Sequence, residues 1–260
     1  MNKIKFKVNN DKFGDFLTKL DDLTKISTTI KLKIDNENTL IYSVLGKAAV
    51  LAFKNYTLKT KDLFEIKEDL EHTYDVVILE GKKFVKNLQF LQGNEKITFE
   101  ISCKENQDDE TVMDTRAIQI VGGKLKINWI GGEHYEIRDM TKASLDKGLD
   151  LKNKKWSFRI TKSDYTDIKK LSSINGTKLL NIAVDKGNVK ILETSAWELE
   201  IDEIEDRNAN FILNKRFLTC INDAKEEIIF NIFENFMLIK DEDSNLMLSF
   251  EQDFQDIDLD

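Results

Sequence analysis

Several features are scarce or absent in this chain of 260 residues, and each absence excludes a class of protein. No run approaches the roughly 20 apolar residues of a membrane span, so no membrane-crossing helix is expected. The first residues alternate between apolar and basic and lack the apolar stretch of a secretory signal. Cys103 and Cys220 lie in separate apolar segments, which favours buried thiols over a disulfide. We therefore expect an intracellular, cytoplasmic protein without a membrane partner.

Proline is missing altogether, and the cations are overwhelmingly lysine. The few arginines are Arg116, Arg138, Arg159, Arg207 and Arg216. Together with abundant Asn and Ile, this composition resembles that of A·T-rich coding. It informs on the type of genome rather than on mechanism.

Catalytic signatures are also absent. His72 and His134 are the only histidines, and neither has a metal-ligand companion at a fixed spacing. No Gly-rich phosphate loop, nucleophile elbow or paired-cysteine motif occurs. The sequence therefore predicts a protein that is not an enzyme and needs no metal or cofactor.

The most informative feature that is present is a long internal repeat. Phe6 and Val8 precede one helical pattern, as Phe158 and Ile160 precede another, and further matched pairs follow in the same order. These are 34–38 with 184–188, and 82–88 with 215–221. A repeat of more than a hundred residues indicates duplicated domains rather than a solenoid. We predict a first domain at 1–132, a connector at 133–155 and a second domain at 156–260.

Strand patterns dominate both halves. Alternation of apolar and polar residues between short polar turns recurs at 29–34, 96–101, 117–121, 124–129, 189–192, 197–201, 227–232 and 245–250. This pattern predicts antiparallel meanders rather than βαβ crossovers. The predicted fold class is α+β, with two similar domains that each carry two helices packed on antiparallel sheets.

Four segments have helical periodicity. One covers about 11–23 after Asn10 or Asp11, a second covers about 82–91, a third follows Ser163 as N-cap, and a fourth follows Asn214 as N-cap. The fourth is expected to bury Phe217, Ile221 and Ala224.

Charge is unevenly distributed, although the formal net charge is −8 (39 basic minus 47 acidic residues). At about 100° per residue, cations gather on or beside the faces opposite the apolar stripes. These candidates for facing DNA are Lys12, Lys19, Lys82, Lys83, Lys86, Lys162, Lys169, Lys170, Lys215 and Arg216. The simpler interpretation, that each lysine is only solvated, applies to any one helix, but the pattern recurs in all four. Lysines on flexible stems favour non-specific phosphate contacts over base readout.

The order and duplication of these elements resemble those of DNA polymerase sliding clamps, in layout the clamps of T4-like phages and more distantly proliferating cell nuclear antigen. The resemblance covers nearly the whole chain. It implies a homotrimeric ring around duplex DNA, a replicative polymerase as partner, and a clamp loader ATPase that opens the ring, in the cytoplasm of an infected bacterium if the protein is viral. Two features depart from the family: the connector lacks its usual proline, and Asp15 and Asp22 make the first helix poorly basic.

The resemblance also implies an apolar groove beside the connector, into which the polymerase docks a short peptide. Phe250 and Phe254 are the candidate residues of this groove. Alternatively, Phe250 is only the last core position of a strand. Two rival functions stay open: a ring-forming structural protein of a virion, and an enzyme with a duplicated β fold that acts on nucleic acid.

Overall fold

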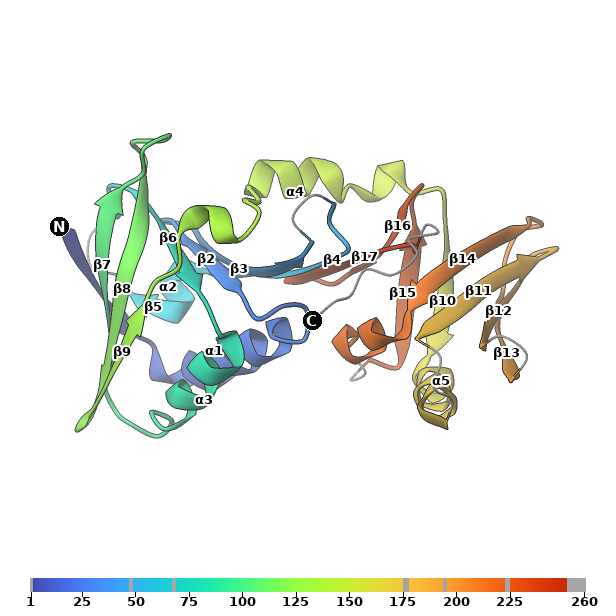
Figure 1. The fold of residues 1–260 in the computed structure, drawn as a ribbon, viewed down its shortest axis with the longest axis horizontal. Helices are drawn as coiled ribbons and strands as arrows, with labels where there is room; N and C mark the ends of the chain where they lie inside the picture. The colour runs from blue at the N-terminus through green and yellow to red at the C-terminus, as the bar shows by residue number, and fades with distance from the viewer. Residues whose placement is uncertain are drawn as a thin grey trace. The chain divides into compact units, whose positions relative to one another are not determined.

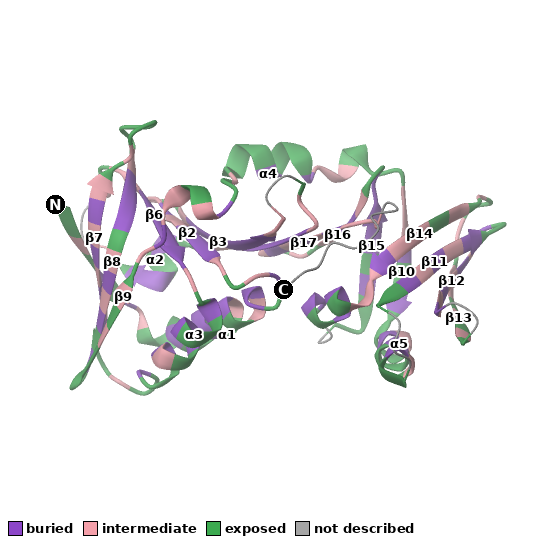
Figure 2. Cartoon of the chain, viewed as in Figure 1, coloured by how far each residue is buried: buried purple, intermediate pink, exposed green. Residues whose placement is uncertain are grey.

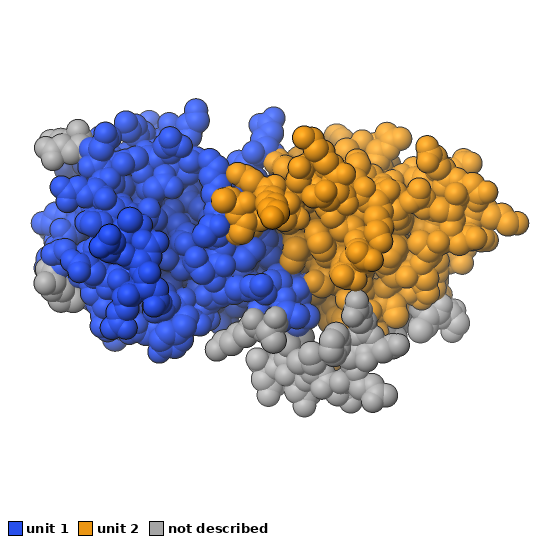
Figure 3. Space-filling view, turned by 90° about the horizontal axis from the view of Figure 1, so that it is seen from above, with its two compact units in different colours: residues 1–142, 242–244 blue, residues 143–241, 245–260 orange. Residues whose placement is uncertain are grey.

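The computed structural model describes residues 2–46, 49–66, 69–174, 178–193, 196–222 and 225–251 (Figure 1). Buried and exposed positions alternate along many of its strands (Figure 2). The chain forms two compact units, residues 1–142 with 242–244 and residues 143–241 with 245–260 (Figure 3). Both units combine sheets with helices, which confirms the α+β class. The boundary after Lys142 lies inside the segment 133–155, whose limits as a connector stay a prediction.

The first unit contains strands β1 to β9. In chain order its elements are β1 (Asn2–Val8), α1 (Asn10–Leu23), β2 (Ile30–Ile34), β3 (Asn38–Leu45), β4 (Ala52–Lys59), α2 (Thr60–Leu63), β5 (Phe64–Glu65), β6 (Thr73–Ile78), α3 (Gly81–Gln89), β7 (Ile97–Glu105), β8 (Val112–Gly122), β9 (Leu125–Ile130) and η1 (His134–Glu136).

Strands of this unit follow the order β4-β3-β2-β6-β8-β7-β1-β5, and β9 pairs with β8. One pair, β6 with β8, is parallel, with Thr73 opposite Val112. The prediction of antiparallel meanders alone is wrong here, because α3 and β7 intervene between these two strands and return the chain in the same direction.

Helices α1 and α3 lie side by side and cover one face of this sheet (Figure 1). On α1, Phe13, Phe16, Leu17 and Leu20 are buried at the spacing of one helical face. On α3, Phe84, Val85 and Leu88 are buried, and Phe84 meets Trp129 of β9 edge-on with ring centroids 5.2 Å apart. The first two predicted helices are thus confirmed.

An ion-pair cluster around the buried Lys31 holds residues 139 and 140 within the first unit. Lys31 is 1% exposed and lies 2.6 Å from Asp75 and 2.7 Å from Asp139. Burial alone would raise the pKa of Asp139, but the hydrogen bonds from Lys31 and Lys33 outweigh it and lower the pKa to about 2. The Tyr42 hydroxyl accepts a hydrogen bond from the Met140 amide at 3.2 Å. Residues 139 and 140 are therefore held against β2, β3 and β6.

From β10 onward, the second unit repeats the order of elements of the first unit, without counterparts of α2 and β5. Its elements are α4 (Lys142–Gly148), η2 (Leu151–Asn153), β10 (Trp156–Thr161), α5 (Lys162–Ile174), β11 (Leu179–Asp185), β12 (Asn188–Glu193), β13 (Trp197–Glu203), β14 (Ala209–Asn214), η3 (Lys215–Cys220), β15 (Glu227–Ile232), β16 (Phe236–Lys240) and β17 (Ser244–Ser249).

Strand pairing in the two units corresponds. Strand β1 pairs with β7 as β10 pairs with β15, and β2 joins β3 and β6 as β11 joins β12 and β14. Likewise, β7-β8-β9 corresponds to β15-β16-β17. Phe6 and Val8 are buried, as are Phe158 and Ile160. The predicted duplication of two similar domains is confirmed.

The beginnings of two predicted helices differ from expectation. Helix α1 begins at Asn10 after the N-cap Asn9, whose side chain makes no capping hydrogen bond. Helix α5 begins at Lys162, so Ser163 is not its N-cap. Instead, the Thr161 hydroxyl accepts a hydrogen bond from the Asp164 amide at 3.2 Å and donates one to the Asp164 carboxylate at 2.5 Å. This exchange satisfies an amide that a helix start leaves unpaired.

The fourth predicted helix is a 3₁₀ helix, η3. Asn214 is its N-cap as predicted, and its side chain accepts a hydrogen bond from the Arg216 amide at 3.1 Å. The Leu218 carbonyl accepts hydrogen bonds from the Ile221 amide and the Tyr165 hydroxyl, in place of the amide four residues on that an α-helix would use. Ile221 is buried, whereas Ala224 lies outside the described residues.

Candidate nucleic-acid interface

Helix α3 presents three lysines to solvent. Lys82, Lys83 and Lys86 are exposed on the side opposite Phe84 and Leu88. Lys83 lies 3.3 Å from Glu80, and both side chains are about two-thirds exposed, so the pair is weak. Lys82 and Lys86 have no ion pair among the described residues. This face therefore carries positive charge that is available to an anion.

Helix α5 carries a second basic face. Lys162, Lys169 and Lys170 are exposed, whereas Tyr165 and Ile168 are buried. Lys162 lies 3.6 Å from Glu226 and Lys170 lies 3.5 Å from Asp167, in pairs that water screens. The Lys169 ammonium lies 5.3 Å from the centroid of the Tyr165 ring. Because these two ion pairs are solvated and weak, Lys162 and Lys170 can exchange their carboxylate partners for phosphate.

Helix α1 contributes less than the other two. Lys12 is exposed, but the Lys19 side chain is only 14% exposed and lies 3.0 Å from both Asp15 and Asp243. Burial alone would lower the pKa of Lys19, and the hydrogen bonds to the two carboxylates outweigh it and raise the pKa. Its charge is already neutralised within the unit. We leave Lys19 out of the proposed surface, and Lys12 stays a prediction.

Lys215 has a structural partner that its sequence position did not reveal. Its ammonium lies 3.4 Å from Glu193, a carboxylate with no exposed surface, which also accepts a hydrogen bond from the Trp197 indole at 3.0 Å. The Lys215 side chain is 21% exposed, so the interpretation as a freely solvated cation is corrected. Arg216 is exposed beside the Phe217 ring, at 5.5 Å from its centroid.

Replacing Lys215 by Met is expected to destabilise the protein. The change leaves the buried Glu193 carboxylate without its counter-charge, and removing one partner of a buried pair costs about 3 kcal/mol. Urea denaturation would measure the free energy of unfolding. The matched control is Lys170→Met, whose side chain is 71% exposed, with an expected loss below about 0.5 kcal/mol. Equal losses in both variants would contradict a structural role for Lys215.

A half-buried aromatic surface surrounds Phe250. Its ring stacks on Phe211 at 4.3 Å, and Trp156 lies 5.8 Å from Phe211. The Arg207 guanidinium lies 5.3 Å from the centre of the Trp156 ring. We call these four residues the aromatic surface. Of these residues, only Phe250 is a candidate from the sequence, because the other three come from separate segments that no local pattern joins. Phe254 lies outside the described residues.

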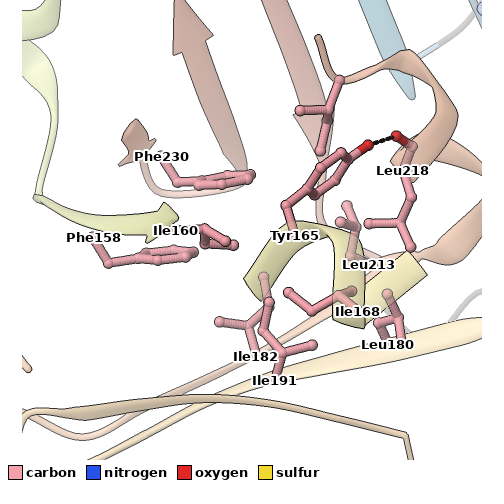
Figure 4. A pocket seen from close by; sticks show the side chains of 11 residues that line it. Phe158, Ile160, Tyr165, Ile168, Leu180, Ile182, Ile191, Leu213, Leu218 and Phe230 are labelled. Carbon is pink, nitrogen blue, oxygen red and sulfur yellow. Dashed lines mark hydrogen bonds between the residues drawn. The ribbon is translucent and has the colours of Figure 1, made fainter. Parts of the chain in front are cut away.

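A small cavity in the second unit is part of its core (Figure 4). It is lined by apolar side chains, among them Phe158, Tyr165, Ile168 and Phe230, and has a volume of about 10 Å³. The stacked rings of Phe158 and Phe230 lie 4.9 Å apart. A cavity of this size and lining is suited neither to a ligand nor to an ordered water.

The part of the chain that the structure describes contains no recognisable metal-binding site. No group of three or more His, Cys, Asp or Glu side chains there is arranged to hold an ion. The His134 Nδ1 atom lies 3.4 Å from the Asp114 carboxylate, which accepts hydrogen bonds from the side-chain Nδ2 of Asn106. In the same residues, no helix is long and apolar enough to cross a membrane.

Two similar α+β units whose strand pairings correspond, with helices on one side of the sheet, define the fold of the DNA sliding clamps. Solved clamp structures show this fold directly. The DNA polymerase III β chain of Streptococcus pneumoniae is 15% identical, with a TM-score of 0.64, and the match covers 97% of this chain and 66% of that one. The Helicobacter pylori β clamp, solved with a DNA ligase peptide, is 14% identical with a TM-score of 0.63, and the match covers 98% and 68%.

An archaeal clamp matches over its full length. A chain of the PCNA2–PCNA3 complex of Sulfolobus tokodaii is 10% identical with a TM-score of 0.60, and the match covers 95% of this chain and 99% of that one. The present chain thus spans about two thirds of the bacterial clamps. No protein-family model and no curated protein matches the sequence. The clamp fold is confirmed, whereas the predicted likeness to T4-like phage clamps in particular is not supported by these matches.

Proposed function

We propose that this protein is a DNA polymerase sliding clamp, which encircles duplex DNA without sequence preference and tethers a replicative polymerase. One observation carries the proposal: in a chain with the clamp fold, exposed lysines gather on α3 and α5 although the net charge is −8. Lysines contact phosphates without reading bases, and such contacts are weak and salt-dependent. Weak contacts allow a ring to slide, while its closed topology keeps it on the DNA. This role requires no catalysis.

The ring is proposed to contain three copies of the chain. Full coverage of an archaeal PCNA chain, against two thirds of a bacterial clamp chain, supports a protomer of two domains. Head-to-tail contacts between unlike faces close into a ring when the rotation per subunit is a fraction of a turn. Three protomers of 30.2 kDa give a particle of about 91 kDa (3 × 30.2).

Two edge strands suit such a contact. Among the described strands, β9 forms a backbone ladder only with β8 and β13 only with β12, although the Arg159 amide of β10 donates a hydrogen bond to the Asp202 carboxylate of β13. Strand β9 and the turn before it expose Lys124, Lys126 and Ile130, and β13 exposes Glu200 and Glu203. Opposite charges and open hydrogen-bonding groups favour pairing of β9 with β13 of the next copy.

The aromatic surface is the proposed docking site for a polymerase peptide, and a clamp loader ATPase is the proposed agent of ring opening. The Helicobacter pylori clamp was solved with a DNA ligase peptide, which supports peptide docking in proteins of this fold. A phage origin, and with it action in the cytoplasm of an infected bacterium, stays a prediction. No finding favours the alternative of a structural virion protein.

Topological retention on DNA tests the function. Loaded with the cognate loader and ATP, the protein is expected to stay on closed circular duplex through gel filtration at 0.5 M salt and to be lost after one restriction cut. The salt removes contacts that rest on phosphate charge alone. Retention that is equal on circular and linear DNA would contradict encirclement, as would loss from both.

A further inference from the structure

The described chain ends on the open edge of a strand in the second unit. Strand β14 is the last in the order β13-β12-β11-β14, so one of its edges has no neighbouring strand in that sheet. The Glu251 amide donates a hydrogen bond to the Ile212 carbonyl of β14 at 2.9 Å. The preceding residue, Phe250, stacks on Phe211. After β17, the backbone has therefore made its first hydrogen bond to the free edge of β14.

Beside this edge, the guanidinium of the aromatic surface has a nitrogen whose hydrogen-bonding capacity is unused among the described residues. The Arg207 Nε atom is buried and has no hydrogen-bond partner among the described residues. The adjoining rings of Trp156 and Phe211 are only half-buried. A guanidinium forms its strongest hydrogen bonds with carboxylates, and the rings offer apolar contact area next to it. The surface is therefore suited to a peptide that carries both acidic and apolar side chains.

The next nine residues of the sequence have that composition. The segment 252–260 contains Asp253, Asp256, Asp258 and Asp260, with the apolar residues Phe254, Ile257 and Leu259 among them. Fully extended at about 3.3 Å per residue, nine residues reach about 30 Å. That reach far exceeds the 5.8 Å between the rings of Phe211 and Trp156.

We propose that residues 252–260 bind in cis along the edge of β14 and over the aromatic surface, with an aspartate on Arg207. Addition of an extended segment to an open sheet edge supplies backbone hydrogen bonds, and the side chains supply specificity. A short tether gives the segment a millimolar effective concentration, so it competes with peptides of other proteins. The inference rests on the proposed function in one respect: the contested surface is the proposed polymerase-peptide site.

Competition in trans tests the proposal on the full-length chain. The probe is a fluorescein-labelled peptide with the sequence of residues 252–260, followed by anisotropy. The double variant Phe254→Ser with Ile257→Ser is expected to bind the probe at least about tenfold more tightly than the unmodified chain, because its own segment competes poorly. Adding Arg207→Gln to this variant should weaken probe binding at least about fivefold.

Arg159→Gln is the matched control, since Arg159 lies three positions from Trp156 on the other face of β10 and pairs with Glu227. It should leave probe binding unchanged. Hydrogen exchange tests the proposal without a substitution in the aromatic surface. Backbone amides of residues 209–214 should exchange faster in the Phe254→Ser, Ile257→Ser variant than in the unmodified chain.

Equal probe affinity of the unmodified chain and the double variant would overturn the proposal, and so would absence of probe binding or unchanged exchange in β14. The assay contains no DNA, loader or polymerase. Its failure would therefore leave retention on circular DNA intact, and failure of that retention would not affect probe binding.

Discussion

Reversing the charges of Lys82, Lys86 and Lys170 to Glu is expected to abolish polymerase stimulation while leaving the fold intact. The three lysines are exposed on α3 and α5, and Asp167, the one acidic partner described for them, is itself half-exposed. The plot of log affinity against log salt concentration has a negative slope of about 0.9 per phosphate contact, so the loss of three contacts should make this slope shallower by about 2 to 3. Anisotropy of labelled duplex DNA across a salt series measures this slope.

Lys152→Glu combined with Lys240→Glu is the control for this variant, because both lysines are exposed and lie outside α3 and α5. The control should retain most of the polymerase stimulation, and both proteins should unfold at the same temperature. Lys215 is excluded from the charge-reversal set, because its pairing with the buried Glu193 would mix a folding defect with a binding defect. A salt slope that does not change in the triple variant would count against phosphate contacts by α3 and α5.

Replacing Ile130 by Glu is expected to dissociate the particle from about 91 kDa to protomers of 30.2 kDa at micromolar concentration. Ile130 is 82% exposed at the end of β9, so its replacement costs the isolated protomer little. If Ile130 is buried against β13 in the ring, its replacement removes about 1.5 to 3 kcal/mol of stabilisation by apolar burial. The new carboxylate would also lie near Glu200 or Glu203 and be repelled by it. Sedimentation equilibrium measures the mass.

Ile229→Glu is the matched control for the interface. Ile229 is an exposed isoleucine, at 48%, on β15, which belongs to neither proposed edge. Its replacement should leave the native mass unchanged. Dissociation by both variants to the same extent would point to general destabilisation, and a trimer that survives Ile130→Glu would remove β9 from the interface.

Elements with strong local periodicity could be predicted from the sequence. Strand β15 has the predicted limits 227–232, and α1 (Asn10–Leu23) and α3 (Gly81–Gln89) lie close to the predicted ranges 11–23 and 82–91. Boundaries that depend on a single hydrogen bond were predicted less well. Thr161 replaces Ser163 at the start of α5, and the segment after Asn214 is a 3₁₀ helix, followed by a hydrogen bond from the Ile221 amide to the Leu218 carbonyl three residues earlier.

The candidate site divides in the same way. Lys82, Lys86 and Lys170 lie exposed as the helical wheel indicates, since the apolar stripe of a helix fixes its outer face. The sequence pattern also places Lys19 and Lys215 on or beside the outer faces of their helices. In the structure, however, they are neutralised by Asp243 and Glu193, which come from other segments. The aromatic surface depends likewise on strands that meet only in the folded unit.

By itself the sequence determined the duplicated α+β architecture and the faces of its helices. The duplication follows from matched segments in the two halves, and the helix faces follow from the spacing of apolar residues along a short stretch of chain. Tertiary structure alone decided which cations stay available, which strand edges remain open and which aromatic rings gather around Phe250. Those properties depend on distances between residues far apart in the chain, and only folding sets these distances.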